Sequence, residues 1–382
     1  MRRLAIAGSS VGALALVAGL SLALPTDLPP LRPDELASVG SLGPWPPPAV
    51  RDASNRVSGR AEAAALGEVL FHSTRLSTVG GLRCASCHEP WRHFTDGRAR
   101  ALGAEAGARN TPSLLNARLQ HWFGWDGAND SLWSQSIRPM LDAREMRSDA
   151  AHVAQALRDD ETLKRLYALA FGHAPPADDE TALVDAGKAL AAYQETLTSE
   201  RTPFDAVRDA LVRGDGAAAE RYPAAAQRGL RLFIGRGQCI ACHAGPNFSD
   251  GEFHRSLIVS KVHDGTDDSG RTLGLEKLLA SPYARNTHFN DEANAARGPA
   301  SRPSEAGAFR TPGLREVSAT APYMHDGSIA NLCDATRPHA TLEGRPMPAL
   351  ALAERRDVVA FLRTLSAQER AVLIDEDAMI CR

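Results

Sequence analysis

Two short cysteine motifs constrain this sequence of 382 residues more than any other feature. Both have the pattern C-x-x-C-H, and their fixed positions are Cys84, Cys87 and His88 in the first half and Cys239, Cys242 and His243 in the second. In such a motif the two thiols form thioethers with the vinyl groups of a haem, and the His ligates the iron. The alternative, a pair of zinc or disulfide sites, is disfavoured because zinc sites need further Cys or His at matching spacing. The sequence therefore predicts two covalently bound haem c groups, with His88 and His243 as iron ligands.

The rest of the chain favours helices. Ala, Leu and Arg dominate and aromatic residues make up 5%, a mix that suits short helices better than sheets. Apolar residues recur at helical spacing over 60–71, 131–141, 150–157, 162–171, 180–196, 202–211, 224–233 and 351–365, whereas 249–308 is rich in loop residues. Each half places a helix ending in Leu-Phe before its haem motif, as in a weak internal repeat. We expect a mainly α protein with two cytochrome c-like domains in tandem, 51–214 and 215–382, each enclosing one haem.

The N-terminus is typical of an export signal. Arg2 and Arg3 precede an apolar run from Leu4 to Ala23, and Pro25 follows directly. We interpret residues 1–24 as a signal peptide, with an uncleaved membrane anchor as the alternative, and residues 25–50 as a proline-rich extended tether. A net charge of −3 gives no indication of nucleic acid or an anionic membrane surface as a partner. The expected location is the periplasm.

Cys333 and Cys381 remain outside the two haem motifs. In an oxidising compartment a leftover pair is expected to form a disulfide rather than to remain as two free thiols.

Several further stretches lie in a characteristic order. They are Arg109-Asn110-Thr111-Pro112, then Trp125-Asp126-Gly127 with Gln135, Pro139 and Glu145 downstream, then Arg310-Thr311-Pro312, and finally residues 320–327 with the sequence TAPYMHDG. With the two haem motifs, this pattern resembles the bacterial di-haem cytochrome c peroxidases over roughly residues 66–365, and most of all their MauG-type branch.

The resemblance implies roles for individual residues. Trp125 corresponds to a tryptophan between the haems that conducts electrons or holes, and Gln135, Pro139 and Glu145 correspond to the distal pocket of the first haem. Glu145 would be the acid–base that moves a proton between the peroxide oxygens, and Gln135 would hydrogen-bond the bound peroxide. The alternatives without a functional role are that Trp125 is a core residue and that Glu145 is a solvated surface carboxylate.

The resemblance also implies a calcium ion between the haem domains. Asn110, Thr320 and Pro322 match its ligands, because one side-chain oxygen and two backbone carbonyls suit a hard cation. The alternative is that residues 320–323 matter only as a turn.

Two positions depart from the family pattern. Peroxidases that need reductive activation have a His seven residues before the Arg-Asn pair, and Leu102 stands there. The first haem is therefore expected to be five-coordinate. The sixth ligand of the second haem, Met or Tyr in the family, falls fourteen residues after His325, on His339. We expect His339 to ligate the second iron, with Met347 as the alternative, and an imidazole there would lower the reduction potential.

These features predict a periplasmic di-haem oxidoreductase that reduces hydrogen peroxide at an open first haem and shares oxidising equivalents with the second. The electrons would come from a small cytochrome c, from a cupredoxin or from side chains of a protein substrate. The competing hypotheses are an electron carrier with two saturated haems and an enzyme that binds dioxygen at the open haem.

Overall fold

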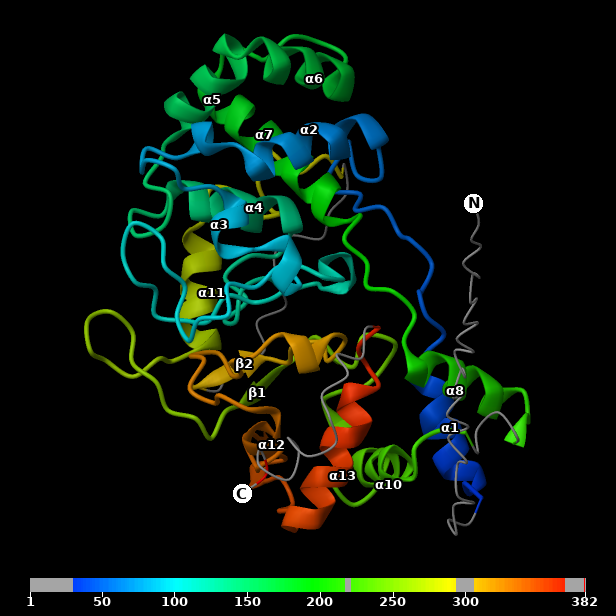
Figure 1. The fold of residues 1–382 in the computed structure, drawn as a ribbon. Coiled ribbons are helices and arrows are strands. Elements are labelled where there is room, and N and C mark those ends of the chain that lie inside the picture. The colour runs from blue at the N-terminus through cyan, green and yellow to red at the C-terminus, as the bar shows by residue number, and fades with distance from the viewer. Residues whose placement is uncertain (1–29, 217–220, 293–305, 368–380, 382) are drawn as a thin grey trace, which may run out of the picture.

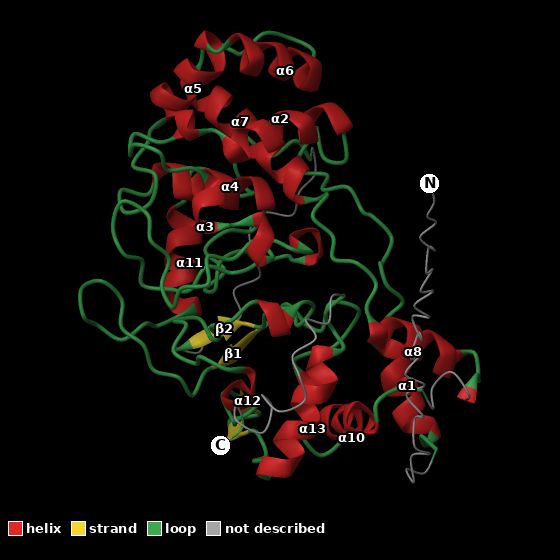
Figure 2. Cartoon of the chain, viewed as in Figure 1, coloured by secondary structure: helices red, strands yellow, loops and turns green. Residues whose placement is uncertain are grey.

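The computed structural model describes residues 30–216, 221–292, 306–367 and 381 (Figure 1). The predicted signal peptide or anchor, residues 1–24, lies outside this part of the chain. Within the described residues, no helix is both long and apolar enough to cross a membrane. Helices and loops make up almost all of the described chain, and the strands are short (Figure 2), so the predicted mainly α class is confirmed.

The first half folds around a central helix. Its helices are α2 (Ala61–His72), α3 (Cys84–Cys87), α4 (Leu132–Leu141), α5 (Ala150–Asp159), α6 (Glu161–Phe171) and α7 (Asp179–Gln194). Helix α7 begins after Asp178, whose carboxylate accepts a hydrogen bond from the backbone N–H of Thr181 at 2.8 Å and so caps the helix. Residues 182–194 of α7 are buried, because α2, α4 and α5 pack around it. This helix therefore forms the centre of the first core.

The second core is built from both ends of the described chain. Its helices are α1 (Pro33–Ser41), α8 (Pro203–Val212), α10 (Ala224–Ile234), α12 (Leu332–Ala335) and α13 (Leu352–Arg363). Two small antiparallel sheets accompany them: β1 (Phe253–Arg255) pairs with β2 (Ala308–Arg310), and β3 (Thr341–Leu342) pairs with β4 (Arg345–Pro346). Helix α11 (Arg271–Ala280) and five 3-10 turns complete the described elements: η1 (Thr74–Leu76), η2 (Pro90–Arg92), η3 (Ala117–Leu119), η4 (Cys239–Ala241) and η5 (Val317–Ala319).

The internal repeat has a common packing unit. The helix before each haem motif crosses the last long helix of its half, α2 on α7 and α10 on α13. A glycine lies at each crossing, Gly67 and Gly229, where an added Cβ would overlap the backbone of the facing helix. Four residues later each helix carries a phenylalanine in the core, Phe71 and Phe233. Close helix contact therefore fixes both haem motifs against their domains in the same way.

Two expectations about the domain limits need correction. Residues 25–50 are not an extended tether throughout, because α1 forms over Pro33–Ser41 and its Val39 is buried in the second core. Pro33 at the start of α1 is compatible with a helix, since the first turn does not use that N–H. Helix α8, placed in the first domain by the sequence, buries Phe204 in the second core beside α1 (Figure 1). By packing, the two cores divide before Pro203 rather than near 214.

A buried ion pair fixes this arrangement. Arg315 donates two hydrogen bonds to the carboxylate of Asp205 in α8, at 2.9 and 2.8 Å, and both side chains are fully enclosed. The guanidinium lies 3.5 Å from the ring centroid of Trp45. Trp45, in the segment after α1, thus packs on the Arg315–Asp205 pair, and this contact fixes the segment to the second core.

The segment 249–308 is less irregular than expected. It contains α11, which the sequence pattern did not predict, and Tyr283 just after it is buried in the first core. This part of the second half therefore lies against the first domain (Figure 1).

Candidate functional site

The first C-x-x-C-H motif forms one helical turn. Cys84 and Cys87 bound α3, and the backbone N–H of His88 donates to the carbonyl of Cys84 at 2.9 Å. Nδ1 of His88 donates to the carbonyl of Phe94 at 3.0 Å, which leaves Nε2 free as a metal ligand. Burial lowers the pKa of His88, so the imidazole is neutral, as iron ligation requires.

The second motif repeats this geometry. Nδ1 of His243 donates to the carbonyl of Phe248 at 3.0 Å, and Phe248 has the same left-handed backbone as Phe94, with φ of 54° and 59°. Burial, and next the proximity of His339, lower the pKa of His243 to about 4. Both motifs therefore hold a neutral imidazole whose tautomer is set by a backbone carbonyl.

A cavity lies against the first motif. Its wall includes Cys84, Cys87, His88, Gln135, Pro139 and Glu145. The structure thus brings together all of the residues that the sequence assigned to the first haem and its distal pocket. Both cysteine sulfurs and an imidazole on one apolar cavity fit a covalently attached haem.

The hydrogen bonds of Gln135 orient its side-chain amide. Asn129 Nδ2 donates to Gln135 Oε1 at 2.8 Å. The amide oxygen is therefore occupied, and Nε2 of Gln135 remains as a donor toward the cavity. Pro139 lies four residues further along α4 and has no N–H, so the carbonyl of Gln135 has no intrahelical partner.

Glu145 lies on the loop after α4 and is paired with a base that the sequence analysis did not identify. Arg138 Nη2 lies 2.8 Å from Glu145 Oε1, and this carboxylate is the main cause that raises the pKa of Arg138. Arg138 lies on α4 and Glu145 on the loop that follows it, so helical spacing did not suggest this pair.

The loop that contains Leu102 covers Glu145. The N–H of Ala104 donates to the carbonyl of Glu145 at 2.9 Å. Gly103 lines the cavity, and an added Cβ would lie 2.6 Å from the Cα of Glu145. Leu102 is 47% exposed and is not part of the described cavity wall. Close backbone packing here requires glycine and sets the position of Glu145.

A larger cavity lies against the second motif. Cys239, Cys242 and His243 line it together with both sequence candidates for the sixth ligand, His339 and Met347. Nδ1 of His339 donates to the carbonyl of Arg337 at 2.8 Å, so its Nε2 is free in the same way as that of His243. The donor set fits a second haem c.

The residues assigned to electron transfer and calcium lie on the same wall. Trp125, Asn110, Thr320 and Pro322 all line the second cavity. The indole Nε1 of Trp125 donates to the backbone carbonyl of Asn110 at 2.9 Å, and Asn110 Nδ2 donates to the carbonyl of Arg98 at 2.7 Å. Asn110 Oδ1 accepts no hydrogen bond from the described residues, so it remains a candidate oxygen ligand.

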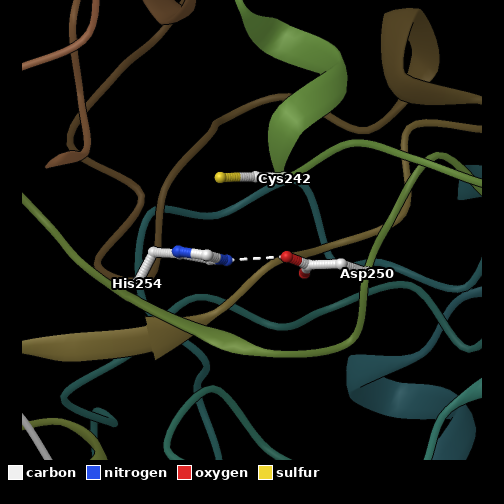
Figure 3. A group of neighbouring side chains, drawn as sticks. All are labelled: Cys242, Asp250 and His254. Carbon is white, nitrogen blue, oxygen red and sulfur yellow. Dashed lines mark hydrogen bonds and ion pairs between the residues drawn. The ribbon is translucent and has the colours of Figure 1, made fainter. Parts of the chain in front are cut away.

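Asp250 and His254 form a charged pair beside the second motif, which the sequence did not predict. His254 Nε2 lies 2.7 Å from Asp250 Oδ2, and the sulfur of Cys242 lies close to the same imidazole (Figure 3). The hydrogen bond to Asp250 is the main cause that raises the pKa of His254 to about 10. Three such donors can hold a metal ion, but Cys242 is the residue expected to carry a thioether. The only sequence signal was an Asp and a His soon after the motif.

Cys333 and Cys381 form a disulfide with Cα atoms 5.4 Å apart. Cys333 lies in α12, six residues before His339. The disulfide therefore links residue 381 to the segment that leads into the wall of the second cavity.

Known proteins share these features over most of the chain. A model of the family described as di-haem cytochrome c peroxidase matches residues 61–213. The chain is 34% identical over 326 residues to the methylamine utilization protein MauG of Methylorubrum extorquens, which covers 82% of this chain and 81% of that protein. It is 28% identical over 314 residues to the cytochrome c551 peroxidase of Pseudomonas aeruginosa, which covers 80% and 79%.

A solved structure agrees with these relatives. A MauG-like protein associated with microbial copper homeostasis superimposes with a TM-score of 0.63 at 27% identity, over 86% of this chain and 95% of that one. Since the relatives extend through both haem motifs, and each motif meets a cavity that suits a haem, the chain belongs to the di-haem cytochrome c peroxidase family of oxidoreductases, which carry two haem c groups.

Proposed function

We propose that this protein reduces hydrogen peroxide at its first haem site. The observation that carries the proposal is that Glu145 and Gln135 share one cavity with His88. His88 is the only imidazole among the described residues lining that cavity, and Met146, the only thioether there, is packed in the first core. This supports an iron with an accessible distal side.

The chain's own residues supply the proton chemistry. When bound, the haem iron provides the position at which peroxide is reduced. Glu145 takes a proton from one peroxide oxygen and delivers it to the other, so that the departing oxygen leaves as water. Arg138 orients this carboxylate through the 2.8 Å pair, and Gln135 Nε2 donates a hydrogen bond to the bound peroxide. The overall change consumes two electrons and two protons for each peroxide and yields two molecules of water.

The second site stores and passes on electrons. We assign His243 and His339 as its two axial ligands and Trp125 as the conduit between the sites. The electrons come from a small cytochrome c, from a cupredoxin or from side chains of a protein substrate. A MauG relative and a cytochrome c551 peroxidase relative are both compatible with this range of donors.

Peroxide titration of the oxidised protein tests the main proposal. A rapid change in the Soret band after one equivalent of hydrogen peroxide is the expected result. An inert spectrum together with reversible reduction of both haems would indicate an electron carrier instead, and a spectral response to dioxygen in the reduced protein but none to peroxide would indicate a dioxygen enzyme.

The axial assignment has its own test. We expect His339→Ala to abolish the low-spin absorption of the second haem and Met347→Leu to preserve it. The reverse pattern would make Met347 the ligand.

The calcium ion is also a proposal, with Asn110 Oδ1 and the carbonyls of Thr320 and Pro322 as ligands. We expect about one calcium per chain by elemental analysis of the wild type, and its loss in Asn110→Ala. An equal calcium content in both proteins would remove Asn110 from the ligand set.

Export completes the proposal, with residues 1–24 as the signal peptide. N-terminal sequencing of protein from the periplasmic fraction should begin after residue 24. Intact residues 1–24 in a membrane fraction would instead indicate an uncleaved anchor.

A further inference from the structure

Arg310 is a buried cation without a carboxylate partner. It lies at the end of β2 and is 4% exposed. Nε donates to the carbonyl of Gly124 at 3.3 Å and Nη1 to the carbonyl of Thr311 at 3.2 Å. No Asp or Glu among the described residues pairs with this guanidinium, and burial alone lowers its pKa, to about 10. Arg310 is therefore still charged at neutral pH.

Of the other enclosed arginines nearby, Arg109 and Arg315 have carboxylate counter-ions, whereas Arg271 packs against the rings of Trp122 and Phe253. Arg109 pairs with Asp126 at 2.6 Å and with Asp268 at 2.7 Å, and Arg315 pairs with Asp205. Burying an uncompensated charge is costly, so buried charges in proteins are normally paired. Among the described residues Arg310 has neither a carboxylate nor an aromatic ring as a partner, which indicates that its counter-ion comes from another source.

The free edge of the guanidinium identifies where that anion lies. Nη2 makes no hydrogen bond with the described residues, and Arg310 lines the second cavity together with His243 and His339. The unpaired cation therefore borders the same cavity in which Cys239 and Cys242 would hold a haem. A haem carries two propionate carboxylates, which suit the planar donor pattern of a guanidinium.

We propose that Arg310 binds a propionate carboxylate of the second haem. The inference rests on the proposed function only in that it needs a haem in the second cavity, and it does not depend on peroxide chemistry. It makes Arg310 a positioning residue for the porphyrin, in addition to the thioethers and the axial ligands.

Arg310 also holds the conduit residue. Its backbone N–H donates to the carbonyl of Trp125 at 2.9 Å, and its Nε contacts the preceding residue, Gly124. A single residue therefore joins the segment carrying Trp125 to the edge of the second haem. This contact would fix the separation between Trp125 and the porphyrin.

Arg310→Gln in the full-length holoprotein tests the proposal, with Arg271→Gln as the matched control. Arg271 is also buried and also bonds a carbonyl of this loop, that of Gly127, at 2.7 Å. Its guanidinium packs against the rings of Trp122 and Phe253, 4.3 and 4.2 Å from their centroids, and does not line the second cavity. Haem content and the reduction potential of each haem are measured in the wild type and both variants.

We expect two haems per chain in all three proteins, because the thioethers do not depend on Arg310. The potential of the second haem should fall only in Arg310→Gln, since an uncompensated propionate stabilises the ferric form. Arg310→Lys keeps the charge, so the potential of its second haem should lie between those of the wild type and Arg310→Gln. This intermediate value separates charge loss from misfolding.

An unchanged potential in Arg310→Gln, or an equal fall in Arg271→Gln, would overturn the inference even if the enzyme reduces peroxide. A wild-type potential that depends on added formate would assign Arg310 to a soluble carboxylate instead and would likewise overturn it. Conversely, a selective shift in a protein that is inert toward peroxide would support the inference and defeat the proposed function.

Discussion

Glu145→Gln should nearly abolish peroxide turnover while leaving the fold intact. The substitution preserves the size of the side chain and removes its capacity to accept and deliver a proton. A positioned acid–base contributes about 10²–10⁴-fold in rate, equivalent to about 2.7–5.4 kcal/mol in the activation barrier. We therefore expect kcat with hydrogen peroxide to fall by about that factor.

The structural cost of the same change is small. The side chains of Arg138 and Glu145 are 41% and 34% exposed, and an ion pair of this kind contributes about 0–1 kcal/mol to stability. Arg138 also keeps a second carboxylate, since its Nη1 lies 3.4 Å from Asp142 Oδ2. The expected kinetic loss thus exceeds the expected loss in the free energy of unfolding.

Stopped-flow kinetics with hydrogen peroxide and urea unfolding of the same preparation measure both effects. Glu105→Gln is the matched control, because Glu105 lies near Arg144 and Arg147 on the neighbouring loop but does not line the cavity. If Glu145→Gln retains turnover within about threefold of the wild type, or if Glu105→Gln loses as much, proton relay by Glu145 is refuted.

Three further predictions concern packing and charge. Gly103→Ala should displace Glu145 and lower peroxide turnover, while absorbance shows that both haems are retained. Gly80→Ala is the control and should keep its turnover, because an added Cβ there meets nothing within 4 Å. Equal activity in the two variants would contradict the packing argument. Asp205→Asn leaves Arg315 without its buried counter-charge and should lower the free energy of unfolding by about 3–5 kcal/mol in urea titrations; a loss under about 1 kcal/mol would show that the pair is not critical. Burial alone would raise the pKa of Asp126 and Asp268, but Arg109 lowers both below the ordinary value of 3.8. Their contribution to stability is therefore present above about pH 4 and lost as the pH falls through the folded pKa, so urea midpoints below about pH 4 should fall less steeply in Asp268→Asn than in the wild type.

Local patterns in the sequence were enough to predict most of the helices. Periodicity predicted a helix over 180–196, and α7 spans Asp179–Gln194. The helix expected over 224–233 is α10, Ala224–Ile234. These predictions held because each helix carries its own apolar face and, in α7, its own cap at Asp178. The C-x-x-C-H motifs are equally local, since one turn of chain contains all three groups.

Features that depend on distant contacts could not be predicted in this way. Helix α1 is short and lies among prolines, and it is stabilised by packing against α8 and α10. The assignment of α8 to the second core rests on Phe204 and on the Asp205–Arg315 pair, whose members are 110 residues apart. Arg138 and His254 became visible as site residues only through their contacts with Glu145 and Asp250.

The repeat suggests how two similar haem sites could take the different roles proposed for them. Each half supplies the proximal His in the same way, through a carbonyl of a left-handed phenylalanine five or six residues later. The distal sides come from unrelated pieces of chain. In the first half, α4 and the loop of Gly103 supply an acid and an amide, whereas in the second half the segment after α12 supplies His339 and Met347. A difference in axial ligation, and with it the proposed division between peroxide reduction and electron storage, therefore requires no change in the common packing unit, only in the segments that cover it.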